Sequence, residues 1–226
     1  SGHINHKYLK ESESDKKAVI VVTANRGLAG GYNSNITRMI IDEGFTKENT
    51  VVYAVGKKGR ELLERKGYEI KADYSEAINE PIYKDAKEIC DDVLSAFADG
   101  EVGEIYLAYT VFKNTVVHEP QLIRLLPVEA DDAAHETDGS EALMTYEPSE
   151  EEALDMIIPK YVCSLVYGAL IESVASENGA RMQAMDSATS NAEEMISTLS
   201  LKYNRARQAS ITQELTEIIA GANAIE

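Results

Sequence analysis

The sequence lacks tryptophan, has only two cysteines and five prolines among 226 residues, and contains no run of 18 apolar residues. A helix that crosses a bilayer needs about 20 consecutive apolar residues, so no direct membrane insertion is expected. The polar start of the chain lacks the apolar core of a signal peptide, which predicts a protein soluble in its own right. Cys90 and Cys163 form no CxxC motif, which favours two thiols in a reducing compartment and leaves one disulfide as the alternative.

Basic residues are also scarce, because 22 Lys and Arg oppose 39 Asp and Glu, for a formal charge of −17. Nucleic acids and anionic membranes bind surfaces rich in Lys and Arg, so neither is expected as a direct partner. No basic residue occurs from Leu125 to Pro159, where the acidic residues are Glu129, Asp131, Asp132, Glu136, Asp138, Glu141, Glu147, Glu150, Glu151, Glu152 and Asp155. This stretch is interpreted as a solvated loop that leads into an acidic helix start. A cation site is the alternative, although no calcium-loop pattern is present.

Short β-branched runs alternate with amphipathic segments in the first half of the chain. Strands are predicted at residues 18–23, 50–55 and 104–110, with a short edge strand at 69–72 and an extended pair, 114–117 and 121–128, broken at Pro120. Helices are predicted after an N-cap at Asn33 or Ser34, over 59–66 and over 82–97. This alternation predicts an α/β fold with a Rossmann-like, mainly parallel sheet flanked by helices.

Four segments are expected along the chain: a polar leader at 1–17, an α/β domain at 18–128, an acidic linker at 129–148, and C-terminal helices at 149–226. Residues 143–146 are a candidate last strand within the linker. The spacing of Ser149 and Glu152 resembles a capping box and predicts a helix start. Pro159 is expected to break or restart this helix, and Gly168 and Gly179 are either tolerated within it or mark kinks.

The turn after the first predicted strand contains Gly27, Gly30 and Gly31. A strand that feeds a helix through glycines can aim backbone N–H groups at a phosphate. The pattern GxxGG matches neither GxGxxG nor GxxxxGK[ST], and no Lys stands at the helix start. The alternative is a tight structural turn that needs positive φ angles.

Candidates for catalysis and metal binding are few. The histidines, His3, His6, His118 and His135, are scattered along the sequence, with His3 and His6 as candidates for adventitious metal binding only. Cys163 lies on an apolar helix face, where a buried structural thiol is expected. The residues therefore indicate no catalytic constellation within this chain.

The last third of the chain predicts one long helix. No Gly or Pro occurs from Ala180 to Ala220, a stretch that would span about 60 Å as a helix at 1.5 Å per residue. Alternate steps of three and four residues mark a seam: Met182, Met185, Thr189, Ala192, Ile196, Leu199, Tyr203, Ala206 and Ser210. A second stripe then takes over at Ile211, Leu215, Ile218, Ala222 and Ile225. A seam of this length predicts a coiled-coil-type helix with a partner helix, and an ordinary core helix is the alternative.

Polar residues gather near the far end of this helix: Lys202, Asn204, Arg205, Arg207, Gln208, Thr212, Gln213 and Glu214. Arg207 and Gln208 offer planar donor groups that suit carboxylates. By spacing alone, a solvated helix face is an equally good interpretation.

Two segments closely resemble the gamma subunits of F-type rotary ATP synthases. They are TANRGLAGGYNSN, from Thr23 to Asn35, and the stretch from Ala180 to Glu226, in which Ile211-Thr212-x-Glu214-x-x-Glu217 precedes Gly221-Ala222. The resemblance covers nearly all of the chain and is weakest in the acidic linker. It implies the central-stalk rotor of a proton- or sodium-translocating ATP synthase, with an α/β domain at the foot and a long C-terminal helix inside the ring of alpha and beta subunits. Such a rotor couples ion flow through the membrane ring to ATP synthesis.

The resemblance also implies roles for residues and partners. Arg207, Gln208, Thr212 and Glu214 match positions that contact a loop of the catalytic beta subunit. ATP binding and hydrolysis belong to the other subunits, so the chain is expected to be non-catalytic and free of cofactors, with Gly27, Gly30 and Gly31 as a structural turn. The implied partners are the alpha, beta and epsilon subunits and the membrane c-ring, at the cytoplasmic face of a bacterial-type cell membrane.

This sequence departs from the family pattern in two respects. Family members begin with a long N-terminal helix that pairs with the C-terminal one, whereas this sequence starts after it, so a truncated, soluble chain is expected to pair its seam with a second copy or to leave the long helix partly disordered. Ala29 stands where some relatives have Cys, and the dithiol insertion of chloroplast members is absent, which argues against thiol regulation. Two other classes remain open: a nucleotide-binding α/β enzyme and a coiled-coil dimerisation adaptor.

Overall fold

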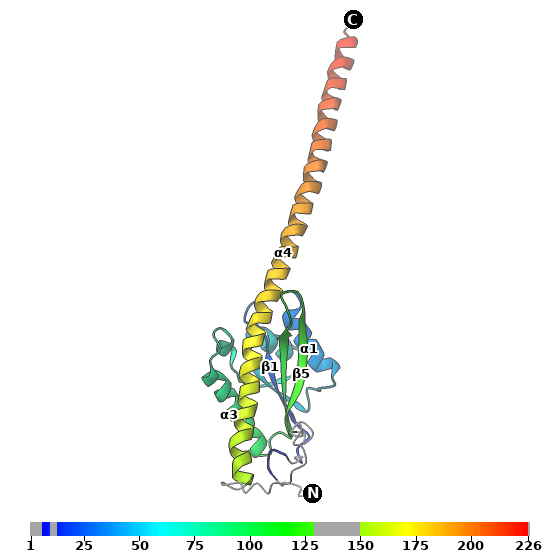
Figure 1. The fold of residues 1–226 in the computed structure, drawn as a ribbon. Coiled ribbons are helices and arrows are strands. Elements are labelled where there is room, and N and C mark those ends of the chain that lie inside the picture. The colour runs from blue at the N-terminus through cyan, green and yellow to red at the C-terminus, as the bar shows by residue number, and fades with distance from the viewer. Residues whose placement is uncertain (1–5, 10–12, 129–149, 226) are drawn as a thin grey trace, which may run out of the picture. The chain divides into compact units, whose positions relative to one another are not determined.

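The structure is a computed structural model, which describes residues 6–9, 13–128 and 150–225 (Figure 1). The chain divides into two compact units, one up to Gln183 and one from Ala184 onward. The first unit holds a five-stranded sheet and its flanking helices, and the second is helical. The predicted fold class, an α/β sheet with a long C-terminal helix, is confirmed.

The sheet has the strand order β3-β2-β1-β4-β5. Its strands are β1 (Lys17–Val22), β2 (Thr50–Val55), β3 (Glu69–Asp73), β4 (Glu104–Phe112) and β5 (His118–Leu126). All neighbouring pairs are parallel except β4 and β5, which form an antiparallel hairpin. β1 and β2 are central and buried on both faces, which explains why their sequences are nearly continuous apolar runs.

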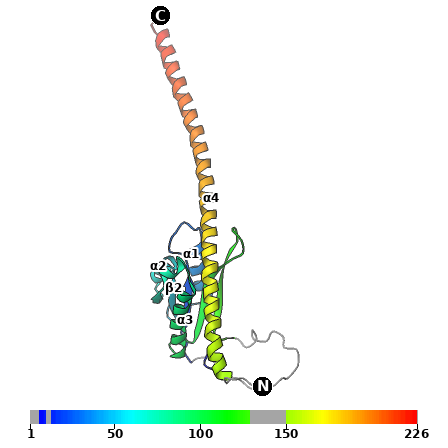
Figure 2. The same cartoon turned by 60° about the vertical axis from the view of Figure 1, so that its left-hand side comes forward.

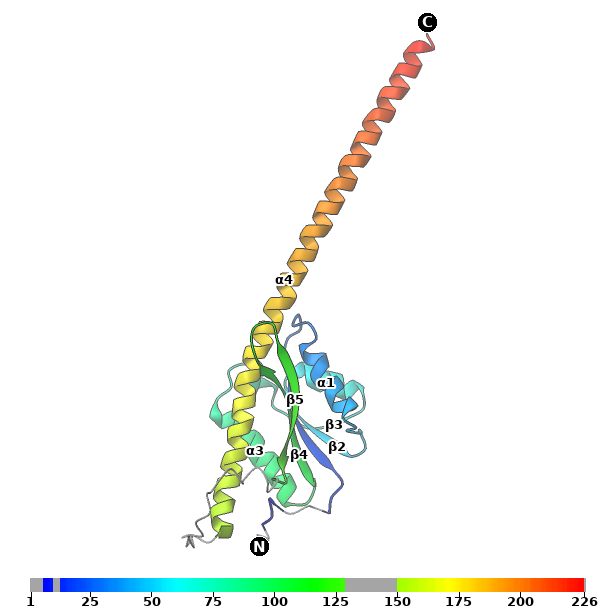
Figure 3. The same cartoon turned by 45° about the vertical axis from the view of Figure 1, so that its right-hand side comes forward.

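Helices cover both faces of the sheet. They are α1 (Tyr32–Asp42), α2 (Lys57–Arg65), the 3-10 turn η1 (Ser75–Ile78), α3 (Tyr83–Ala98) and α4 (Glu150–Asn223). Ala18, Ile20 and Val22 of β1 join a core that includes α3 and the first part of α4, which lie side by side in Figure 2. Val19 and Val21 point to the opposite face and join the core of α1 and α2, as Figure 3 shows for α1. The alternation of these side chains follows from the two-residue period of a strand.

Two prolines lie inside elements that they were expected to interrupt. Pro120 belongs to β5, opposite Thr110 of β4, and is tolerated because β5 is an edge strand with one row of unpaired backbone groups. Pro159 lies within α4. The buried side chains of Ile158 and Val162, on either side of it, pack into the core and hold the helix across the proline.

The start of α1 also differs from the expectation. The helix begins at Tyr32 with Gly31 at the N-cap, so neither Asn33 nor Ser34 caps it. Asn33 instead accepts a hydrogen bond from the backbone N–H of Ala24 through Oδ1, at 2.8 Å. The side chain expected at the cap therefore stabilises the turn that precedes the helix.

The second unit is built on residues 184–223 of α4, which are helical throughout and would extend about 60 Å at 1.5 Å per residue. Their side chains are exposed on all sides. A helix whose side chains are exposed on every side can contact partners all around its axis. The candidate strand at 143–146 and the whole predicted acidic linker, 129–148, lie outside the described residues.

One stretch of α4 has the composition of a membrane span, because an 18-residue window within Glu151–Asn223 has a mean hydropathy of 1.5. One such helix is weak evidence, since a core helix of a soluble protein can have the same composition, and 33% of this window is buried within the fold. Ile158, Val162, Val166 and Leu170 supply apolar side chains of α4 to the core. The absence of membrane insertion stays a prediction.

Candidate functional site

The carboxyl ends of β1 and β4 mark the point where a ligand would bind in a fold of this kind. From β1 the chain passes to β2 on one side, while β4 pairs with the other side of β1. In open α/β sheets, nucleotides occupy the crevice outside the strand ends at this change of direction. The glycine turn directly follows β1 and therefore lies at this crevice.

Helix α4 fills this crevice. The Tyr32 hydroxyl, at the start of α1, donates a 3.0 Å hydrogen bond to the Ser173 carbonyl oxygen of α4. Ala180 of α4 packs against Ala24, Ala29 and Tyr32. Burial raises the pKa of Tyr32, so the phenol is neutral and acts as a donor at physiological pH. The space that a Rossmann-type enzyme reserves for its nucleotide is occupied by the protein itself.

Side chains that follow β1 also cap the start of α2. Thr23 Oγ1 accepts the N–H of Gly59 at 2.8 Å, and Asn25 Oδ1 accepts the N–H of Lys57 at 3.0 Å. Both donors belong to the first turn of α2, whose N–H groups have no partner within the helix. The N–H groups at this helix start are therefore capped by side chains of the β1 turn.

The three glycines of the turn differ in conformation. Gly30 has a φ of 57°, while Gly31 has a φ of −82° and precedes α1. A methyl group at Gly27 would have no neighbour within 4 Å. Leu28 takes the other positive φ of the turn, 61°, although its side chain is 78% exposed. The role of these glycines as a structural turn stays a prediction.

Titration of the chain with ATP or NAD in a calorimeter is expected to give only the heat of dilution, because α4 closes the crevice and side chains cap the start of α2. The measurement requires nucleotide at millimolar concentration against tens of micromolar protein. A dissociation constant tighter than about 100 μM, roughly −5.5 kcal/mol of binding free energy, would contradict this expectation.

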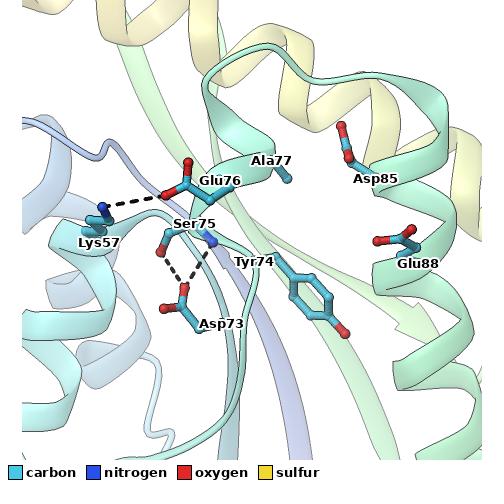
Figure 4. A pocket seen from close by; sticks show the side chains of 8 residues that line it. All are labelled: Lys57, Asp73, Tyr74, Ser75, Glu76, Ala77, Asp85 and Glu88. Atoms are coloured by element: carbon cyan, nitrogen blue, oxygen red, sulfur yellow. Dashed lines mark hydrogen bonds and ion pairs between the residues drawn. The ribbon is translucent and has the colours of Figure 1, made fainter.

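A cavity of about 260 Å³ lies beside α2, η1 and α3, and Figure 4 shows its lining: Lys57, Asp73, Tyr74, Ser75, Glu76, Ala77, Asp85 and Glu88. Its charged groups have partners, some within the lining and some beside it. Lys57 Nζ lies 3.6 Å from Glu76 Oε1, and the backbone N–H of Ser75 donates to Asp73 Oδ1 at 2.9 Å. Asp85 accepts the N–H at the N-cap of α3. These contacts stabilise the connection from β3 through η1 to α3.

The Asp73→Asn variant tests that structural role. Burial would raise the pKa of Asp73, but hydrogen bonds from Ser75 and the charge of Arg60 lower it below its usual value. A lowered pKa means that the ionised carboxylate stabilises the fold above about pH 3.9 and that this contribution is lost as the pH falls further. We expect the variant to lose less than about 1 kcal/mol at pH 7, because Asp73 and Arg60 are each about one-third exposed, and to lose nothing at pH 2. Urea unfolding at both pH values measures the difference; an equal loss at the two would contradict the electrostatic account.

His6 and both cysteines lie in the part of the chain that the structure describes. His6 Nδ1 accepts the N–H of Tyr8 at 3.3 Å, and its Nε2 lies 3.2 Å from Asp155 Oδ1 at the start of α4. Cys90 and Cys163 are free and buried, and burial raises the pKa of the Cys90 thiol, which keeps it protonated and unreactive. Among the described residues, no group of three His, Cys, Asp or Glu side chains is placed to hold a metal ion. His3 and His135 lie outside the described residues.

The polar set in the second unit is accessible. Arg207, Gln208, Thr212 and Glu214 are all exposed on α4. Arg207 and Glu214 are seven residues apart and share one side of the helix, while Gln208 and Thr212 are four apart and share the neighbouring side. The four side chains therefore form a continuous surface around part of the helix, which a partner loop could contact.

Exposed apolar side chains of α4 also occur within the first unit, before the start of the predicted seam. Met182 of the first unit and, in the second unit, Met185, Ile196, Leu199 and Tyr203 are exposed as expected. In the first unit Ile157, Tyr161 and Ile171 are also exposed, with fractions of 60%, 49% and 45%. Counting back from Met182 in alternate steps of four and three residues gives Asn178, Ala175, Ile171, Gly168, Ser164, Tyr161 and Ile157. The same periodicity could have identified this extension.

Comparisons with known proteins agree with this geometry. A family model described as ATP synthase matches residues 1–225. The ATP synthase gamma chain of Lachnoclostridium phytofermentans is 66% identical over all of this chain and 79% of its own length. The sodium ion specific ATP synthase gamma chain of Acetobacterium woodii is 42% identical over all of this chain and 80% of its own length. A chain of the central stalk and c-ring structure of the Tetrahymena thermophila mitochondrial ATP synthase aligns with a TM-score of 0.60 and 25% identity, over 82% of this chain and 83% of its own.

The packing of α4 against the turn after β1, together with a helical segment exposed on all sides, favours a stalk protein over a nucleotide-binding enzyme. The chain belongs to the ATP synthase gamma family. It is a central-stalk rotor subunit, and the catalytic sites of its complex lie on other subunits.

Proposed function

We propose that this chain couples ion flow to ATP synthesis through two surfaces of α4. The observation that carries the proposal is the exposed polar set, Arg207, Gln208, Thr212 and Glu214, on a helical segment that nothing in its own unit covers. The Arg207 guanidinium can bind a carboxylate of a partner through two parallel hydrogen bonds. A partner loop of the catalytic beta subunit, with acidic and polar side chains, fits this surface.

The alpha and beta subunits are the partners proposed for the second unit, and the epsilon subunit and the c-ring are those proposed for the first. An assembly of this kind would lie at the cytoplasmic face of the cell membrane. The net charge of −17 supports protein partners over an anionic membrane surface for this chain. The coupling ion is a proton or sodium, and the 42% identical Acetobacterium woodii relative is named as sodium ion specific.

The seam is proposed to bind another helix. Its exposed members include Met182, Met185, Ile196 and Leu199, whose burial against a partner would contribute roughly 1.5–3 kcal/mol for each large side chain. In the working rotor this partner is the N-terminal helix that the resemblance implies. A second copy of the chain is the alternative partner, and light scattering at low micromolar concentration would then show a dimer; an ordered monomer would count against pairing.

Co-purification tests the proposed function. The full-length chain, expressed with tagged alpha and beta subunits, is expected to elute with both as one complex that hydrolyses ATP. The coiled-coil adaptor alternative predicts a homodimer that leaves alpha and beta behind. A control chain that ends at Ala184 lacks the proposed contact surface and should not be retained by the ring.

A further inference from the structure

We propose that Tyr32 and Ser176 anchor α4 against rotation about its own axis relative to the sheet, so that torque passes between the α/β unit and the long helix at residues 173–180. This inference rests on the proposed rotor function. All the contacts involved lie within the first unit. The anchor residues are positioning residues, since they act through α4 and not on a substrate.

The first contact joins α4 to α1. The Tyr32 hydroxyl donates to the Ser173 carbonyl oxygen at 3.0 Å, although this carbonyl lies in the middle of a helix. A carbonyl oxygen has two lone pairs and can accept a second donor besides its helical partner. Tyr32 and Ser173 are both buried, so water does not compete for this bond.

The second contact joins α4 to β4. The Ser176 hydroxyl donates to the Thr110 carbonyl oxygen at 3.2 Å, and both residues are buried. A hydroxyl lies roughly 4 Å from a helix axis, so a rotation of about 20° would move it by about 1.4 Å, enough to break the bond. Two hydrogen bonds to two different elements therefore define one rotational setting of α4.

The third contact is a close approach to the β4–β5 hairpin, which lies beside α4 in Figures 1 and 3. A methyl group at Gly179 would lie 2.7 Å from His118 Cε1 and 3.5 Å from the Thr115 carbonyl oxygen. Glycine at this position lets the hairpin touch the helix. Arg181 and Glu177 form a 2.6 Å ion pair within α4, and the charges of both act on Tyr32.

The hydrogen bonds add a directional constraint to an interface that is otherwise apolar. Ile158, Val162, Val166 and Leu170 bury α4 in the core, where close packing also resists rotation, but only the hydrogen bonds depend directly on the angle between donor and acceptor. The anchor stands at the last buried turns of the first unit, the point at which α4 leaves the core. Torque that enters the sheet must pass this point to reach residues 184–223.

The test measures torsional stiffness in the assembled complex. The full-length chain carries a bead on a cysteine introduced at the exposed position Glu64, and the angular variance of the bead is recorded while the catalytic ring is stalled. The Tyr32→Phe and Ser176→Ala variants are each expected to raise this variance at least about twofold. Tyr68→Phe is the matched control, because its hydroxyl also donates a buried bond to a backbone oxygen, that of Phe45, away from α4.

Three outcomes are distinguishable. A raised variance for Tyr32→Phe and Ser176→Ala, with Tyr68→Phe at the unmodified value, supports the anchor. Variances equal in all three variants overturn it while leaving the rotor function intact. An unmodified chain that neither assembles nor rotates overturns the proposed function itself. Each anchor variant is measured separately, so failure of one to fold leaves the other as the test.

Discussion

Replacing both Arg207 and Gln208 with alanine in the full-length chain is expected to lower ATP hydrolysis by the assembled complex about tenfold or more. Hydrogen bonds that involve a charged group contribute about 1.5–3 kcal/mol, and 1.36 kcal/mol in a barrier is a factor of ten in rate. Both side chains are exposed in this chain, so the free energy of unfolding should change by less than about 0.5 kcal/mol. The prediction thus separates partner contact from stability.

The measurements are the ATP hydrolysis rate and ion pumping of reconstituted complexes, together with urea unfolding of the variant chain. Lys202→Ala is the matched control, since it removes a cation from the same exposed helix at a position turned by about 140° from Arg207. The control should retain most of the activity. Unchanged hydrolysis and pumping in the double variant would remove Arg207 and Gln208 from the proposed contact surface.

The sheet could be predicted because its strands depend on local sequence. The runs at 18–23 and 50–55 are buried on both faces and therefore consist almost entirely of apolar, β-branched residues. Pro120 could not be placed within a strand from local sequence. A proline is tolerated in β5 because β5 is an edge strand, and the order of the strands is known only from the assembled sheet. Pro159 is a similar case, since core packing by Ile158 and Val162 outweighs the lost backbone hydrogen bond.

The candidate site could be predicted only in part. The exposed apolar seam could be predicted because helical positions on one side repeat with a fixed period, whereas the contact role of the polar set stays a prediction. The packing of α4 over the crevice could not be predicted from the sequence. Tyr32 and Ser173 are separated by 141 positions, and their contact depends on how α4 crosses the sheet. A glycine turn after a buried strand is compatible with both a phosphate cradle and a structural turn until that crossing is known.

The glycine with the largest structural constraint is Gly56, and the Gly56→Ala variant is expected to lose about 3 kcal/mol or more of unfolding free energy. Gly56 has a φ of 128°, a region that residues with a side chain rarely adopt. An added methyl group would lie 2.2 Å from the Thr23 backbone oxygen and 2.6 Å from its carbonyl carbon. Backbone strain and overpacking cost roughly 1–3 kcal/mol each, so together they reach this value.

The surrounding backbone cannot easily move aside to relieve this clash. The N–H of Thr23 donates to the Val55 oxygen at 2.9 Å, and the Thr23 hydroxyl accepts the N–H of Gly59. The first bond joins Thr23 to the end of β2 and the second joins it to the start of α2, so displacement of Thr23 would break both. Urea unfolding of Gly56→Ala measures the loss, with Gly27→Ala as the control, because a methyl group at Gly27 meets no atom within 4 Å. We expect the control to change the free energy of unfolding by less than about 1 kcal/mol. Similar losses in both variants would mean that the close approach of Gly56 to Thr23 does not require glycine at position 56.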